Sequence, residues 1–264
     1  TFLGYFAGGT VTTGNDNIAI GNDAMNGGAT TGDNNIAIGV SAGDALTSGI
    51  NNILMGTDAG GAITTGGSNV IIGTEAGDGF TANTTMTLIG YQAGTTINSN
   101  NANGTVAVGY LSLGALTGGA ENTALGSRSG DAATNASGSV FLGFDAGGTV
   151  TTGNQNIAIG LDAMNGGATT GDNNIAIGAK SGDALTSGKE NVLIGADAGG
   201  ALTSQSHCIL IGRNAGTAIN NNVSNGTTIV GRDAGERLTN GVANSALGYS
   251  ALTGNHQGGY NTAI

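Results

Sequence analysis

A short apolar segment closed by glycine recurs along the whole chain, as in Asn-Ile-Ala-Ile-Gly at residues 17–21. The closing glycines are 17 residues apart, with two intervals of 18 and two of 19. They are Gly4, Gly21, Gly39, Gly56, Gly73, Gly90, Gly109, Gly126, Gly143, Gly160, Gly178, Gly195, Gly212, Gly231 and Gly248. Such a period is typical of a solenoid, in which each repeat forms one coil and stacks on its neighbours. We expect one continuous array over residues 1–264, as a fragment of a longer chain.

The three residues before each glycine read as a short strand. The first and third are mostly β-branched or aliphatic, and we expect this pair to line the inside of the coil. The middle residue then points outward, yet no coil has a polar residue there. An apolar column repeated in every coil is more than a soluble monomer normally exposes to water. We therefore expect another copy of the chain to bury it. The expected oligomer interface is Ala19, Ala37, Leu54, Ile71, Leu88, Phe141, Leu193, Leu210 and Ile229.

Composition supports an all-β chain with a thin core. No 3.6-residue periodicity is present, and the chain has 53 Gly, no Pro and no Trp. The absence of proline suits a chain in which most backbone amides donate to an adjacent coil. We therefore predict an all-β parallel β-solenoid, or β-roll, of about fifteen 17-residue coils.

An internal duplication relates residues 8–49 to residues 147–188, which differ at only five positions. Each copy contains one 18-residue coil, with Met25 or Met164 where most coils have glycine, so we expect these methionines to fill a wider coil.

Asparagine occupies several recurring positions. It stands four residues before the closing glycine in ten coils, where stacked amides can form a hydrogen-bonded ladder. The two 19-residue coils carry asparagine-rich insertions, which in solenoids form surface loops. Their amides could bind sugar hydroxyls, although a tolerated insertion is the simpler interpretation. The candidate receptor-binding residues are Asn98, Asn100, Asn101, Asn103, Asn220, Asn221, Asn222 and Asn225.

The net charge of −11 argues against nucleic acid as a partner. No apolar run is long enough for membrane insertion of this segment. Acidic residues stand two positions after seven of the glycines, and clustered carboxylates can hold Ca²⁺. One carboxylate per coil without a fixed ligand set favours a solvated edge, so no cofactor is expected, with Ca²⁺ as the alternative.

Catalytic patterns are missing from the sequence. His207 and His256 lie far apart without Cys or Glu at metal-binding spacing, and neither a nucleophile elbow nor a phosphate-binding loop is present. The single cysteine, Cys208, replaces a ladder asparagine and reads as a small buried hydrophobe. We expect the chain not to be an enzyme.

The motif Asn-Ile-Ala-Ile-Gly-x-x-Ala resembles the head repeats of trimeric autotransporter adhesins, and residues 244–264 resemble related repeats of bacteriophage tail fibres. The coils here are longer than the adhesin head repeat. The resemblance implies a homotrimeric fibre outside a cell or on a virion, which attaches to a glycan or protein of a host surface.

The expected function is therefore that of a structural and adhesive extracellular fibre segment. A self-polymerising filament or surface-layer component is one alternative. An ice-binding solenoid is another, because threonine recurs eight residues after many glycines, as at Thr47, Thr64 and Thr81.

Overall fold

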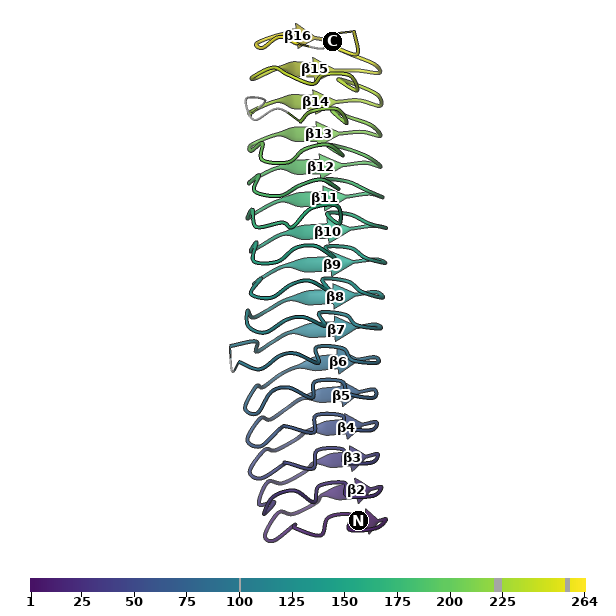
Figure 1. Cartoon of the computed structure of the whole chain (residues 1–264), viewed down its shortest axis with the longest axis vertical. Helices are drawn as coiled ribbons and strands as arrows, with labels where there is room; N and C mark the ends of the chain where they lie inside the picture. Colours follow the sequence, from purple (N-terminus) through teal and green to yellow (C-terminus); the bar gives the residue numbers. More distant parts are fainter. Residues whose placement is uncertain (100, 221–224, 255–256) are drawn as a thin grey trace. The chain divides into compact units, whose positions relative to one another are not determined.

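The computed structural model describes residues 1–99, 101–220, 225–254 and 257–264. It is an all-β parallel solenoid of sixteen short strands and about fifteen coils, and the described residues contain no helix. Two compact units divide the chain, residues 1–135 and 136–264. Within each unit the strands follow one another in chain order (Figure 1).

Unit 1 contains eight strands, each paired in parallel with the next so that equivalent repeat positions are neighbours, as for Ala19 with Ala37 and Ala37 with Leu54. The strands are β1 (Phe2–Leu3), β2 (Ile18–Ile20), β3 (Ile36–Ile38), β4 (Ile53–Met55), β5 (Val70–Ile72), β6 (Thr87–Ile89), β7 (Val106–Val108) and β8 (Thr123–Leu125).

Unit 2 repeats this arrangement with the same register, as for Ala158 with Ala176 and Ala176 with Leu193. Its strands are β9 (Val140–Leu142), β10 (Ile157–Ile159), β11 (Ile175–Ile177), β12 (Val192–Ile194), β13 (Ile209–Ile211), β14 (Thr228–Val230), β15 (Ser245–Leu247) and β16 (Thr262–Ala263).

The strand residues face the opposite way from the prediction. The middle residue of β2–β14 is fully buried inside its coil, whereas the first and third residues point outward and are partly exposed. Alternation fixes only that neighbouring residues point to opposite faces. Because both sets are apolar here, their polarity could not tell inside from outside.

The interior of each coil is narrow and shared by three sets of side chains. The middle strand residue meets a small residue three positions after the glycine and a larger apolar residue seven positions after it, as with Leu54, Ala59 and Ile63. The residue three positions after the glycine is alanine or serine, and it is buried in most coils. Met25 and Met164 are also fully buried, as expected.

Each closing glycine allows the coils to stack closely. Gly39 has φ +143°, and a Cβ added there would overlap the carbonyl group of Gly56 in the next coil. A side chain at this position would therefore separate the two coils.

The asparagine ladder is confirmed. In unit 1, Nδ2 of Asn35, Asn52 and Asn69 donates to the preceding asparagine Oδ1 at 3.2, 3.0 and 3.0 Å. These side chains are buried. The ladder ends where another residue replaces asparagine, as at Met86, which is also buried. Cys208 is likewise buried, and its burial raises the pKa of the thiol.

Candidate interaction surface

The outward side chains of the strands form an apolar surface on each unit. We call the first and third residues of strands β2–β15 the strand face. In unit 1 it consists of Ile18, Ile20, Ile36, Ile38, Ile53, Met55, Val70, Ile72, Thr87, Ile89, Val106, Val108, Thr123 and Leu125. In unit 2 it consists of Val140, Leu142, Ile157, Ile159, Ile175, Ile177, Val192, Ile194, Ile209, Ile211, Thr228, Val230, Ser245 and Leu247. Continuous apolar surfaces of this kind mark interaction sites on soluble proteins.

The nine residues predicted as the oligomer interface do not lie on this surface. Ala19, Ala37, Leu54, Ile71, Leu88, Phe141, Leu193, Leu210 and Ile229 all have 0% exposure within the single chain. They are middle strand residues and fill the coil interior. An intermolecular contact through them is excluded, and the apolar surface available to a partner is formed by their sequence neighbours.

A second exposed column borders the strand face. We call the residue after each closing glycine the corner column: Tyr5, Asn22, Val40, Thr57, Thr74, Tyr91, Tyr110, Ser127, Phe144, Leu161, Ala179, Ala196, Arg213, Arg232 and Tyr249. Several of its large apolar members are about half exposed, including Tyr91 at 46% and Tyr110 at 51%. Two adjacent members form a stacked pair, with the ring centroids of Tyr91 and Tyr110 5.7 Å apart and the planes 10° from parallel.

The described asparagines of the two insertions lie at the surface, as predicted. Asn98, Asn101 and Asn220 are exposed. Asn103 Oδ1 accepts a hydrogen bond from Thr84 N at 2.8 Å, and Asn225 Oδ1 accepts the equivalent bond from Ser206 N at 2.8 Å. In each insertion, one such side-chain oxygen therefore anchors the insertion to the preceding coil. Asn100, Asn221 and Asn222 lie outside the described residues.

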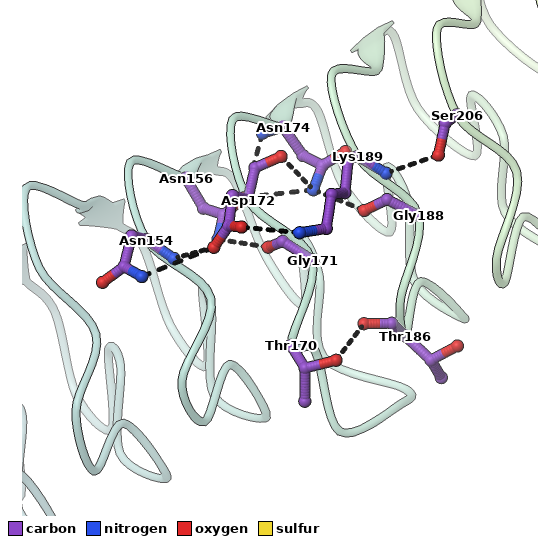
Figure 2. Close-up of polar contacts among 10 residues, drawn as sticks. All are labelled: Asn154, Asn156, Thr170, Gly171, Asp172, Asn174, Thr186, Gly188, Lys189 and Ser206. Atoms are coloured by element: carbon purple, nitrogen blue, oxygen red, sulfur yellow. Dashed lines mark hydrogen bonds and ion pairs between the residues drawn. The ribbon is translucent and has the colours of Figure 1, made fainter.

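Unit 2 shows how side chains connect successive coils (Figure 2). Asn174 Nδ2 donates to Asn156 Oδ1 at 3.1 Å and to the carbonyl oxygen of Gly188 at 2.9 Å. Nearer the surface, Asp172 Oδ1 accepts from Asn154 N at 2.9 Å, and Lys189 Nζ lies 2.9 Å from Asp172 Oδ2. The backbone N–H of Asn154, followed by the Lys189 ammonium, lowers the pKa of Asp172.

Other carboxylates are less favourably placed. Burial raises the pKa of Asp44 and of Asp78, and nearby carboxylates, Asp58 among them, raise both further. Burial also raises the pKa of Asp183. No group of three or more His, Cys, Asp or Glu side chains among the described residues is arranged to hold a metal ion.

The threonine column serves the solenoid itself. Thr47 Oγ1 donates to the carbonyl oxygen of Thr64 at 3.0 Å, and Thr64 Oγ1 donates to that of Thr81 at 3.2 Å. These hydroxyl protons therefore connect neighbouring coils, which does not favour the ice-binding alternative.

Comparison of the chain with protein-family models, with curated proteins and with solved structures gives no match. In the part of the chain that the structure describes, no helix is sufficiently long and apolar to cross a membrane. Function must therefore be argued from the strand face, the corner column and the insertions.

Proposed function

We propose that this chain is a non-enzymatic segment of an extracellular fibre, displayed on a cell surface or a virion, which assembles as a homotrimer and attaches to a host surface. The observation that carries the proposal is the outward-facing strand face. It is repeated in both units, and its first and third strand residues are almost all apolar.

Burial of the strand face against other copies would stabilise the assembly. Each Å² of apolar surface removed from water contributes roughly 25 cal/mol. A second copy offers a surface with the same spacing between coils, so that a ladder of side chains can meet a matching ladder. The choice of three copies follows the resemblance to trimeric adhesin heads, whereas self-association follows from the strand face itself.

The solution mass of the purified chain, measured by light scattering, tests this proposal. We expect a mass near three times 25.3 kDa. A monomer would overturn the assembly and leave the strand face without a partner. A broad distribution of much larger masses would instead favour the self-polymerising filament.

Substitutions at outward and inward strand positions of β3 and β4 separate assembly from folding. A double variant, Ile36→Asp with Ile53→Asp, places charges on the strand face and should give a folded monomer. Leu54→Asp places a charge in the coil interior and should prevent folding of the surrounding coils. Thr65→Asp, at an exposed turn, is the matched control and should keep both the fold and the mass. A double variant that keeps the wild-type mass would contradict the role of the strand face.

A further inference from the structure

The chain concentrates its aromatic residues in the corner column. It contains only five Tyr and five Phe, and half of these ten residues occupy this column. Tyr5, Tyr91, Tyr110, Phe144 and Tyr249 are between 46% and 71% exposed. Exposed tyrosine is enriched at recognition surfaces, since its ring combines an apolar body with a polar tip. This placement indicates that the corner column is an interaction surface.

The corner column is poorly suited to contact its own copies. In a symmetric trimer whose axis follows the solenoid, equivalent coils lie at the same level. Arg213 would then approach Arg213 of the other copies, and Arg232 would approach Arg232. The column also changes character from coil to coil, with Asn22, Val40 and Thr57 in succession, whereas the strand face stays apolar. A foreign ligand therefore fits this column better than a second copy.

Tyr91 and Tyr110 form a stacked pair within it. Their backbone carbonyl oxygens accept hydrogen bonds from Leu111 N at 3.0 Å and from Arg128 N at 2.8 Å. The corner residues on either side, Thr74 and Ser127, are small. Both rings are about half exposed, and these two neighbouring corner residues are too small to cover an aromatic ring.

A hydrogen-bonded polar pair includes the residue that follows Tyr91 in the chain. Gln92 Nε2 donates to Glu75 Oε2 at 2.5 Å, and both side chains are only partly buried. Glu75 has a second oxygen and Gln92 has its amide oxygen, both of which can accept a hydrogen bond, and Gln92 has a second N–H that can donate one. An aromatic face beside such groups matches a pyranose ring, which has weakly apolar C–H faces and hydroxyl groups around its edge.

We propose that Tyr91 and Tyr110 form a stacking subsite for pyranose rings of a neutral surface glycan, with Gln92 and Glu75 binding the hydroxyl groups. This inference rests on the proposed adhesive function and names the ligand class. A single subsite of this kind binds weakly, and three copies in one fibre would raise the overall affinity through avidity.

Saturation-transfer NMR tests the subsite, with soluble neutral oligosaccharides of glucose, galactose, mannose and N-acetylglucosamine as probes. We expect transfer to ring C–H protons of at least one sugar. Binding should weaken about tenfold in Tyr91→Ala and in Tyr110→Ala, as expected for loss of an aromatic contact. Tyr260→Ala is the control, since Tyr260 is 82% exposed and lies outside the corner column. Equal binding by all variants, or no transfer to any probe, would overturn the proposal.

Light scattering on the same samples distinguishes this inference from the proposed assembly. If Tyr91→Ala reduces the mass to that of a monomer, the rings belong to the interface between copies, and the glycan subsite is overturned. If the wild-type chain is a monomer that still binds a sugar through Tyr91, the subsite stands and the trimer does not.

Discussion

At the residue scale, a ladder asparagine such as Asn52 connects several coils. Its Nδ2 donates to Asn35 Oδ1 at 3.0 Å and to Gly66 O at 2.9 Å, while its own Oδ1 accepts from Asn69 N at 3.1 Å. All three asparagine side chains are buried, so the bonds cannot be replaced by water without opening the coil. Buried polar groups that lose their partners cost more than the bonds contribute in net stability.

We therefore expect Asn52→Leu to lower the free energy of unfolding by on the order of 2–3 kcal/mol. Urea denaturation followed by circular dichroism measures the change. Asn101→Ala is the control, because Asn101 is exposed and lies outside the ladder, and we expect it to change stability by no more than about 0.5 kcal/mol. Equal stability of Asn52→Leu and the wild-type chain would mean that the ladder adds nothing to the stacking.

The sequence predicts the asparagine ladder better than it predicts which strand side chains point into the coil. The ladder was predictable because a polar amide at a fixed place in an apolar repeat needs a partner, and its stacked copies supply one. The predicted orientation of the strand residues was wrong, although the sequence contains a signal for the correct one. A large residue stands four positions after the glycine only in coils with alanine in mid-strand, as for Met25 with Ala19 and Leu113 with Ala107.

That exchange of volume has a structural explanation. Both residues of each pair are fully buried. A Cβ added at Gly147, the corresponding position after Phe141, would overlap the Phe141 ring. A large side chain fits at one of the two positions, but not at both. This compensation identifies the middle strand residue as internal.

At the scale of the element, the strand and its closing glycine form a unit whose length and boundaries the repeat predicts well. The predicted strands end at the residue before the glycine, and the structure places β2–β15 there. The backbone conformation of the turns was harder to predict from the sequence. Residues two and twelve positions after the glycine adopt left-handed conformations, as at Asp58 with φ 53° and Ser68 with φ 60°. Both positions accept many residue types, so no consensus residue indicated them.

A substitution at a closing glycine tests how closely the coils approach each other. Gly39→Ala would place a methyl group against the Gly56 carbonyl and impose φ +143° on a residue with a side chain. We expect a loss of more than about 3 kcal/mol, or failure to fold. Thermal unfolding measures it. Gly104→Asn is the control, since Gly104 has φ +70°, which asparagine tolerates, and its Cβ would meet only ordinary contact with Glu121 Cγ at 3.7 Å. Similar melting temperatures for both variants would contradict the close approach of the coils.

At the scale of the whole molecule, acidic charge opposes the compact coil. The chain carries a net charge of −11, and neighbouring carboxylates interact across coils, as Asp58 does with both Asp44 and Asp78. Their folded pKa values lie above the ordinary value of 3.8, so the folded state binds more protons than the unfolded state above that pH. These groups therefore make the fold more stable as the pH falls from 7 towards about 4.

Asp78→Asn should accordingly raise the melting temperature at pH 7, and the gain should shrink as the pH falls towards 3.8 and disappear below it, where the wild-type carboxyl is protonated in both states. Asp172→Asn is the matched control with the opposite sign. The lowered pKa of Asp172 gives stability that is present above pH 3.8 and is lost as the pH falls further, so this variant should melt earlier at pH 7. Calorimetry at pH 7 and pH 4, with and without a chelator, measures both. If Asp78→Asn melted earlier at pH 7, and only without the chelator, the carboxylates would be held together by a bound cation, and the Ca²⁺ alternative would replace simple repulsion.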